Sequence, residues 1–328
     1  MNAILESLPV VVLYPHSRCN CRCLMCDIWK QTDRREIGAE EFGRYLEDFE
    51  RLRVRWVVLS GGEPLMHSDW SGLCDRLRAR GIRTTILSTG LLFDRDARRI
   101  ADSADDVIVS LDGPPLVHDR IRRIPGAFGV LARGVDAIRK YRPDMPIAAR
   151  STVQRENHGE LRETARTAEA LGLNSISFLA ADVTSEAFNR PGGWTPQRQR
   201  EIALTASELP KLEAEIEGLI LNRGGSPFLA DSPDKLRRIV LHFRAHLGLA
   251  EARAPICNAP WVSTVIEADG TVRPCFFHPP IGNAAEAGLL GVLNGSAGRS
   301  FRESLDVASN PLCQRCVCSL NFPNGSSG

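Results

Sequence analysis

Three cysteines near the N-terminus constrain this 328-residue chain more than any other feature. Cys19, Cys23 and Cys26 follow a C-x3-C-x2-C spacing, so one short loop brings three thiolates to one side of a compact soft-metal centre. Iron–sulfur clusters are normally held by four cysteine thiolates, and three ligands on one loop leave one iron open to a small molecule. An open position makes a metal site catalytic rather than structural. A structural zinc loop is the alternative interpretation of this stretch.

A glycine-rich turn, Ser60-Gly-Gly-Glu-Pro64, follows the apolar run at Trp56 to Leu59. The glycines let the main chain approach a ligand closely, and Glu63 can accept hydrogen bonds from an ammonium group. With the cysteine loop, this turn resembles the radical S-adenosylmethionine (radical SAM) family, in which the loop holds a [4Fe-4S] cluster, the methionine part of SAM chelates the fourth iron, and the turn holds its amino group. The matching positions are Cys19, Cys23 and Cys26 for the cluster and Gly61, Gly62, Glu63 and Pro64 for SAM.

A second segment, Val109 to Pro114 followed by Arg122, is similar to the strand and helix start of radical SAM enzymes that modify peptides and small polar molecules. In that subgroup a serine touches the ribose and amino acid part of SAM, and an arginine meets its carboxylate. The resemblance implies these roles for Ser110 and Arg122. The alternatives are a solvated helix charge for Arg122 and a turn-stabilising role for Asp112.

The region from residue 10 to about 181 repeats a strand-then-helix pattern. Helical periodicity is strong in segments such as 42–49 and 128–138, and Ser68 and Gly81 are candidate ends of another helix. Six such units predict an α/β fold, a partial (β/α)6 TIM-type barrel, with the motifs gathered at the carboxyl ends of the strands. The expected strands are Val10 to Tyr14, Trp56 to Leu59, Thr84 to Ser88, Val107 to Leu111, Ile147 to Val153 and Ser175 to Leu179.

The middle of the chain predicts a rim loop and a helical bridge. Arg190 and Trp194 in the irregular stretch 180–194 would suit a polar or aromatic substrate. Helical patterns follow at residues 197–209 and 233–247, the second with Ser232 as N-cap. The predicted domains are a barrel at 1–195, a helical bridge at 196–254 and a small hairpin-plus-helix iron–sulfur domain at 255–328.

The last segment contains five cysteines, with a hairpin pattern around the Asp269-Gly270 turn. From the residues alone the site could hold zinc or an iron–sulfur cluster. The spacing resembles the SPASM and twitch extensions of radical SAM enzymes, which carry auxiliary [4Fe-4S] clusters; the full SPASM pattern has seven cysteines. We therefore expect one auxiliary cluster of the twitch type. Its expected ligands are Cys257, Cys275, Cys313 and Cys316, with Cys318 as an alternative ligand or a free thiol.

Composition limits the partners. With 41 basic and 40 acidic side chains the net charge is +1, so no broad field favours nucleic acid or an anionic membrane surface. Met1 to Pro9 has no signal-peptide pattern, which predicts a cytoplasmic protein whose clustered cysteines bind metal instead of forming disulfides. Cys74 lies on a helical stripe and is expected to pack in the core.

The resemblance implies reductive cleavage of SAM to a 5'-deoxyadenosyl radical that abstracts a hydrogen atom, with an electron donor such as flavodoxin or ferredoxin. The preferred substrate is a small polar molecule of the sugar, cyclitol or nucleoside type, oxidised or rearranged, because no leader-binding extension precedes Val10. The alternative is a maturase that crosslinks or epimerises a ribosomal peptide. A third hypothesis is a zinc-stabilised binding module without catalysis.

Overall fold

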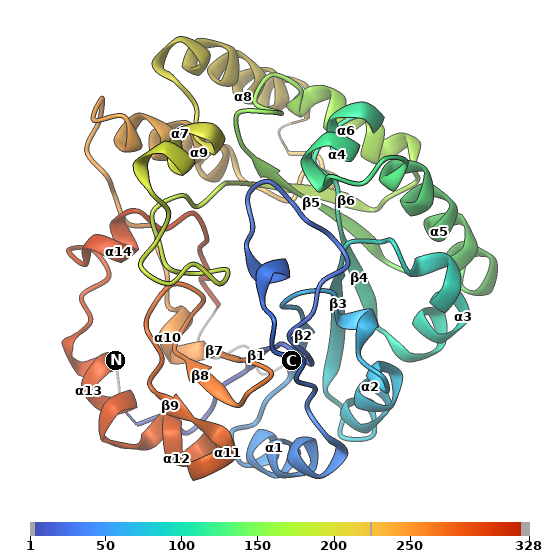
Figure 1. The fold of residues 1–328 in the computed structure, drawn as a ribbon, viewed down its shortest axis with the longest axis vertical. Coiled ribbons are helices and arrows are strands. Elements are labelled where there is room, and N and C mark those ends of the chain that lie inside the picture. The colour runs from blue at the N-terminus through green and yellow to red at the C-terminus, as the bar shows by residue number, and fades with distance from the viewer. Residues whose placement is uncertain (1–3, 224, 323–328) are drawn as a thin grey trace. The chain divides into compact units, whose positions relative to one another are not determined.

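The computed structural model describes residues 4–223 and 225–322. Its strands form one sheet in the order β6-β5-β4-β3-β2-β1-β7-β8-β9 (Figure 1). The first six are the predicted strands, with ends shifted by at most one residue, and the predicted six-stranded α/β class is confirmed. Their bounds are Val10–Leu13 (β1), Trp56–Leu59 (β2), Arg83–Ser88 (β3), Asp106–Ser110 (β4), Ile147–Val153 (β5) and Ser175–Ala180 (β6).

The described residues divide into two compact units. The first unit contains residues 4–18, 31–86 and 253–322, and the second contains residues 19–30 and 87–252. The chain passes from one unit to the other within β3. The predicted domain ends at 195 and 254 stay predictions. They were drawn from sequence patterns, whereas the two units are defined by the contacts within each.

In the first unit, β1 is the centre of the sheet. It pairs in parallel with β2, Val10 opposite Trp56, and on its other side with β7 (Ser263–Ile266), Val10 opposite Ser263. The predicted hairpin is confirmed, because β7 is antiparallel to β8 (Thr271–Arg273), and β9 (Gly282–Asn283) follows. The sequence did not indicate that this hairpin would extend the barrel sheet.

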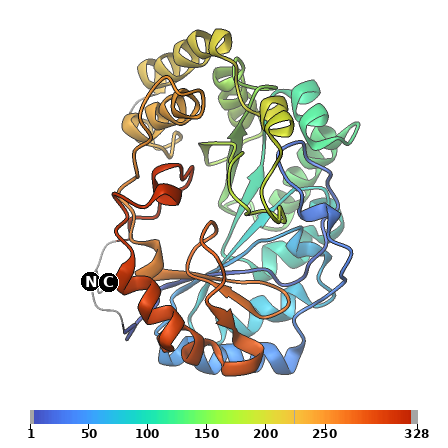
Figure 2. The ribbon, with the colours of Figure 1, turned by 60° about the vertical axis from the view of Figure 1, so that its left-hand side comes forward.

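Helices cover this part of the sheet. The helix α1 (Ala39–Arg51) buries the predicted apolar stripe, including Phe42 and Phe49, while α2 (Trp70–Arg78) has Asp69 in the N-cap position. The predicted cap Ser68 is therefore wrong, and its hydroxyl bonds Glu36 instead. Figure 2 shows the C-terminal segment in orange and red. Its helices are α10 (Ala259–Val262), α11 (Ala284–Ala287), α12 (Leu289–Asn294), α13 (Ser296–Ser304) and α14 (Pro311–Gln314).

The second unit is built on β4, β5 and β6, which are parallel neighbours. Among its helices α3 packs on α5, α6 on α8, and α9 on β6 (Figure 1). They are α3 (Phe93–Ser103), α4 (Pro115–Arg122), α5 (Ala127–Tyr141), α6 (Leu161–Ala170), α7 (Pro196–Ile202), α8 (Leu209–Arg223) and α9 (Pro233–His246).

Two helix ends in this unit test the sequence pattern. Ser232 caps α9, accepting a hydrogen bond from the Lys235 N–H, as predicted. The single helix expected at 197–209 is wrong, because α7 ends at Ile202 and a capping box of Thr205 and Glu208 starts a new helical segment. Across the described residues, no helix has both the length and the apolar character that crossing a bilayer requires.

Candidate functional site

The predicted SAM-binding turn follows β2 in the first unit and packs closely on Tyr14, the residue after β1. Gly61 has φ +95°, and a Cβ there would lie 2.6 Å from Cγ of Tyr14, so backbone conformation and space both require glycine. Pro64 begins a short 3-10 helix, and Glu63 caps it by accepting from the Leu65 N–H at 3.2 Å. The turn is therefore rigid before any ligand binds.

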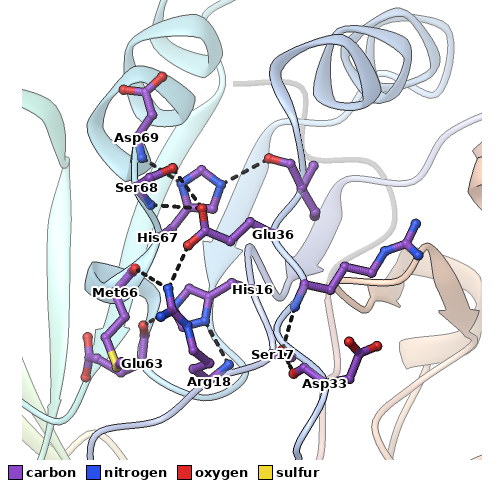
Figure 3. Close-up of polar contacts among 12 residues, drawn as sticks. His16, Ser17, Arg18, Asp33, Glu36, Glu63, Met66, His67, Ser68 and Asp69 are labelled. Carbon is purple, nitrogen blue, oxygen red and sulfur yellow. Dashed lines mark hydrogen bonds and ion pairs between the residues drawn. The ribbon is translucent and has the colours of Figure 1, made fainter.

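A buried histidine fixes this turn to the residue that precedes the cysteine loop (Figure 3). The His16 Nε2–H donates to the Glu63 carbonyl oxygen at 2.6 Å, and His16 Nδ1 accepts from the Arg18 N–H at 2.8 Å. The Glu63 N–H donates to the Arg18 carbonyl at 3.0 Å. Burial lowers the pKa of His16, which favours the neutral ring that these two bonds require. Arg18 adjoins Cys19, so this network fixes the start of the loop.

A second layer supports these residues. Arg18 Nη2 lies 2.9 Å from a Glu36 carboxylate oxygen, and Glu36 also accepts from the Ser68 hydroxyl at 2.7 Å. His67 is buried like His16, donating from Nε2 to the Ile37 carbonyl and accepting from the Asp69 N–H (Figure 3). Sequence reasoning missed both histidines, because isolated histidines outside a spacing motif carry no signal.

The cysteine loop, in the second unit, contacts the predicted arginine. Arg122 Nη1 lies 3.4 Å from the Cys23 sulfur, and Arg122 Nη2 lies 2.5 Å from Asp112. Arg122 is only 7% exposed, so the alternative of a solvated helix charge is wrong. A hydrogen bond from Cys21 and the charge of Arg122 lower the pKa of Cys23 to about 6, whereas burial raises that of Cys26 to about 12.

Asp112 is the anchor for Arg122. It is fully buried, and its carboxylate accepts from the Thr152 N–H at 2.9 Å while its carbonyl accepts from the Asn157 side-chain amide at 2.8 Å. The Asp112 N–H donates to His118 Nδ1 at 3.3 Å. Asp112 thus positions the guanidinium, a role larger than the predicted turn stabilisation. Ser110, half-buried at the end of β4, belongs to the same unit.

The loop after β6 holds the cysteine loop from another direction. Arg190 donates to the Met25 carbonyl at 2.5 Å and pairs with Asp182 at 3.0 Å. The Trp194 indole N–H donates to Asp27 at 2.7 Å, and Arg190 Cζ lies 3.7 Å from the centre of the Trp194 ring. Arg190 and Trp194 are buried against the cysteine loop instead of being available to a substrate, which corrects the role expected for them.

Arg198, at the start of α7, adds a third cation to the same loop. Its guanidinium donates to the Leu24 carbonyl oxygen and also lies over the Trp194 ring. Leu24 and Met25 carry no charge themselves, so the arginines act on their carbonyl dipoles. Both peptide groups lie between Cys23 and Cys26.

The tail cysteines lie near one another within the first unit. The charge of Cys257 contributes to the raised pKa values of Cys275, Cys313 and Cys316, although burial is the main cause; the first two rise to about 11. The carbonyl of Cys318 accepts from the Cys316 thiol at 2.9 Å. The ligand set stays a prediction, and so does the role of Cys318.

The donor chemistry of both cysteine groups fits iron–sulfur clusters, whose usual ligands are cysteine thiolates. Among the described residues, no group of three or more His, Cys, Asp or Glu side chains is placed to hold a metal ion. The sulfurs of both groups also receive N–H donors, from Arg122 at Cys23, the Ala259 amide at Cys257 and His278 at Cys313, as cluster thiolates do.

Comparison with known families gives the assignment. The model of the radical SAM superfamily matches residues 13–168, and that of SPASM, an iron-sulfur cluster-binding domain, matches residues 257–317. The chain belongs to the radical SAM superfamily and carries a C-terminal SPASM domain. The family cofactors are a [4Fe-4S] cluster with SAM and auxiliary iron–sulfur in the SPASM domain.

Individual relatives extend the match. Pre-heme d1 synthase of Dinoroseobacter shibae is 30% identical over 173 residues, 51% of this chain and 42% of the relative. PqqA peptide cyclase of Gluconobacter oxydans is 27% identical over 164 residues, which are 49% of this chain and 46% of the relative. Mycofactocin maturase MftC of Mycobacterium ulcerans is 28% identical over 267 residues, which are 79% of this chain and 66% of the relative. The chain thus spans less than two thirds of each.

A solved structure shows the same fold. Streptococcus suis SuiB bound to S-adenosylmethionine superposes with a TM-score of 0.68 at 16% identity, covering 97% of this chain and 74% of SuiB. The likeness includes the barrel and the C-terminal region.

Proposed function

We propose that this chain is a radical SAM enzyme that modifies a peptide. The observation that carries the proposal is the similarity to mycofactocin maturase over 79% of the chain, together with that to PqqA peptide cyclase. The match to pre-heme d1 synthase covers only 51% of the chain. The peptide therefore replaces the small polar molecule as the preferred substrate.

The residues of the chain have distinct roles in this proposal. When bound, the cluster and SAM supply a 5'-deoxyadenosyl radical that takes a hydrogen atom from a substrate carbon. Cys19, Cys23 and Cys26 hold that cluster, and the turn Gly61 to Pro64 binds the amino group of SAM. The rigidity of the turn keeps the cost of ordering it low when the ligand binds.

Arg122 and Ser110 are the proposed contacts for the remainder of SAM. One terminal nitrogen of Arg122 is committed to Asp112 and the other to Cys23, while its buried Nε has no hydrogen-bond partner among the described residues. A buried donor without a partner is costly, so Nε is the atom that would meet the carboxylate. Asp112 and Cys23 raise the pKa of Arg122 despite its burial, and the cation persists.

We propose one auxiliary cluster, held by Cys257, Cys275, Cys313 and Cys316. The resemblance to twitch-type tails implies these four residues, and the charge of Cys257 contributes to the raised pKa values of Cys275, Cys313 and Cys316, as that of Cys318 does for Cys316. A flavodoxin or ferredoxin is the proposed electron donor.

Isotope transfer tests the substrate class. Anaerobically purified protein is incubated with SAM, dithionite and one pool of deuterated candidates. One incubation contains synthetic peptides, and a second contains sugars, cyclitols and nucleosides. We expect deuterium in 5'-deoxyadenosine from the peptide pool. Transfer from the second pool alone would favour the small-molecule candidate. Zinc without iron and sulfide in the purified protein would instead support the binding module.

A further inference from the structure

We propose that His278 sets the reduction potential of the auxiliary cluster by donating a hydrogen bond from its imidazole to the sulfur of Cys313. The inference rests on the proposed ligation of that cluster. His278 Nε2 lies 3.3 Å from the Cys313 sulfur, within hydrogen-bonding reach of a sulfur acceptor. Two residues more than thirty positions apart are thereby joined at one proposed ligand.

The same residue also lies near a second proposed ligand. Cys275 follows β8 after a one-residue gap, and His278 is three residues further along the chain. Burial raises the pKa of the Cys275 thiol, and the backbones of Phe277 and His278 lower it in part. His278 is therefore next to one proposed ligand in sequence and next to another, Cys313, through its ring.

The surroundings hold the ring in place. His278 is 4% exposed, and its ring meets Phe301 of α13 edge to face, with centroids 4.8 Å apart. Its carbonyl accepts from Arg273 Nη1 at 3.3 Å, and Arg273 is itself paired with Glu267 at 2.5 Å. The imidazole is thus fixed from both the backbone and the ring side.

The direction of the hydrogen bond follows from the chemistry of the acceptor. A cluster-bound cysteine sulfur has no proton to donate, so the proton must be on Nε2. Hydrogen bonds to cluster sulfurs are among the features that set reduction potential. Reduction adds negative charge, which the N–H dipole stabilises, so the bond makes the cluster easier to reduce.

The test isolates the tail cluster. In the whole 328-residue chain, Cys19, Cys23 and Cys26 are changed to Ala, leaving the tail as the site of iron binding, and reduction is followed by EPR at controlled potential. His278→Phe should make the reduction equilibrium about tenfold less favourable, which lowers the midpoint potential by about 59 mV for one electron. His278→Gln, whose amide can donate from the Nε2 position, should restore most of the difference.

His158→Phe is the matched control, because it makes the same change at a half-buried histidine of the second unit and leaves His278 and its surroundings intact; its midpoint potential should stay with that of the parent. If the triple variant does not fold, the same comparison is made with all cysteines present, adding SAM to identify the first cluster by its changed signal.

Iron content separates the possible failures. A parent without tail iron would overturn the auxiliary cluster itself. Four irons with equal midpoints in the parent and His278→Phe would leave the cluster assignment standing and remove the role of His278. Loss of tail iron in His278→Phe alone would show that His278 is needed for the cluster to bind at all, and would overturn its role in setting the potential.

Discussion

The two cysteine groups of this protein differ in the charges that surround them. The N-terminal loop has three arginines, with Arg122 at the Cys23 sulfur and Arg190 and Arg198 at neighbouring carbonyls. The tail cysteines instead receive backbone amides and the ring of His278. The N-terminal loop is thus surrounded by cations, whereas the tail sulfurs receive dipoles and, at Cys313, the charge of the acidic Asp306.

The thiol pKa values of the two groups also differ. The hydrogen bond from Cys21, and after it the charge of Arg122, lower the pKa of Cys23 to about 6, while burial raises those of Cys275 and Cys313 to about 11. A thiol with a low pKa is ionised before metal arrives, whereas thiols with a raised pKa release their protons as the metal binds. The lowering is confined to Cys23, because burial raises the pKa of Cys26, in the same loop, to about 12.

The largest expected effect comes from removing the first group. Changing Cys19, Cys23 and Cys26 together to Ala should abolish 5'-deoxyadenosine formation with dithionite and leave about four irons in the tail. Iron analysis and chromatography of the products measure both results. Cys74→Ala, a change at a fully buried thiol elsewhere in the core, should keep the full iron content. Unimpaired SAM cleavage in the triple variant would refute the cluster assignment.

The buried ion pair gives the next largest effect. Arg122→Met leaves the Asp112 carboxylate buried without its cation, so the metal-free protein should lose about 3 to 5 kcal/mol of unfolding free energy. Urea denaturation measures this loss, and adding Asp112→Asn to the same chain should recover much of it. Arg120→Met, on the same helix but exposed and paired with Glu156, should change stability by no more than about 0.5 kcal/mol. Equal losses in both variants would contradict the comparison.

Arg190 tests whether the cations of the second unit serve the first group selectively. Arg190→Met removes the donor to the Met25 carbonyl and leaves Asp182 unpaired. Iron should fall from about eight per chain toward about four, because the tail cluster does not depend on this contact. The tail EPR signal should persist. A parallel decline of both clusters would show general unfolding instead.

The smallest effect is a change in the slope of stability with pH. Burial and the nearby Arg122 lower the pKa of His118 to about 3, below the unfolded value of about 6.5. The unfolded chain therefore binds the proton first, and stability is lost as pH falls below about 6.5, by about 1.4 kcal/mol per pH unit. His118→Asn keeps an acceptor for the Asp112 N–H and removes this component. If the free energy of unfolding of the parent and of His118→Asn fell in parallel from pH 6.5 to 4.5, His118 would not be the cause of this loss.

The sequence predicted most of what local patterns control. Apolar, β-branched runs located the six strands, and the Asp269-Gly270 turn located the hairpin. The break between α7 and α8 was not predicted, because the apolar periodicity continues across it. The capping box of Thr205 and Glu208 starts a new helical segment there. Asp69 in place of Ser68 is a one-residue error of the usual kind at helix ends.

Contacts between distant residues could not be predicted. Arg190 and Met25 are separated by 165 positions, and no local pattern in either segment indicates that they are in contact. The pairing of β7 with β1 is equally non-local. His16 and His278 are single histidines whose importance arises only from the backbone or sulfur atoms that the fold brings to them.

The imidazole of His16 has a mechanical consequence. One ring spans the Glu63 carbonyl and the Arg18 amide, so the glycine turn cannot shift without pulling on the peptide bond that leads into Cys19. A displacement of the backbone at Glu63 is therefore passed through one imidazole to the backbone at Arg18, and the reverse holds as well.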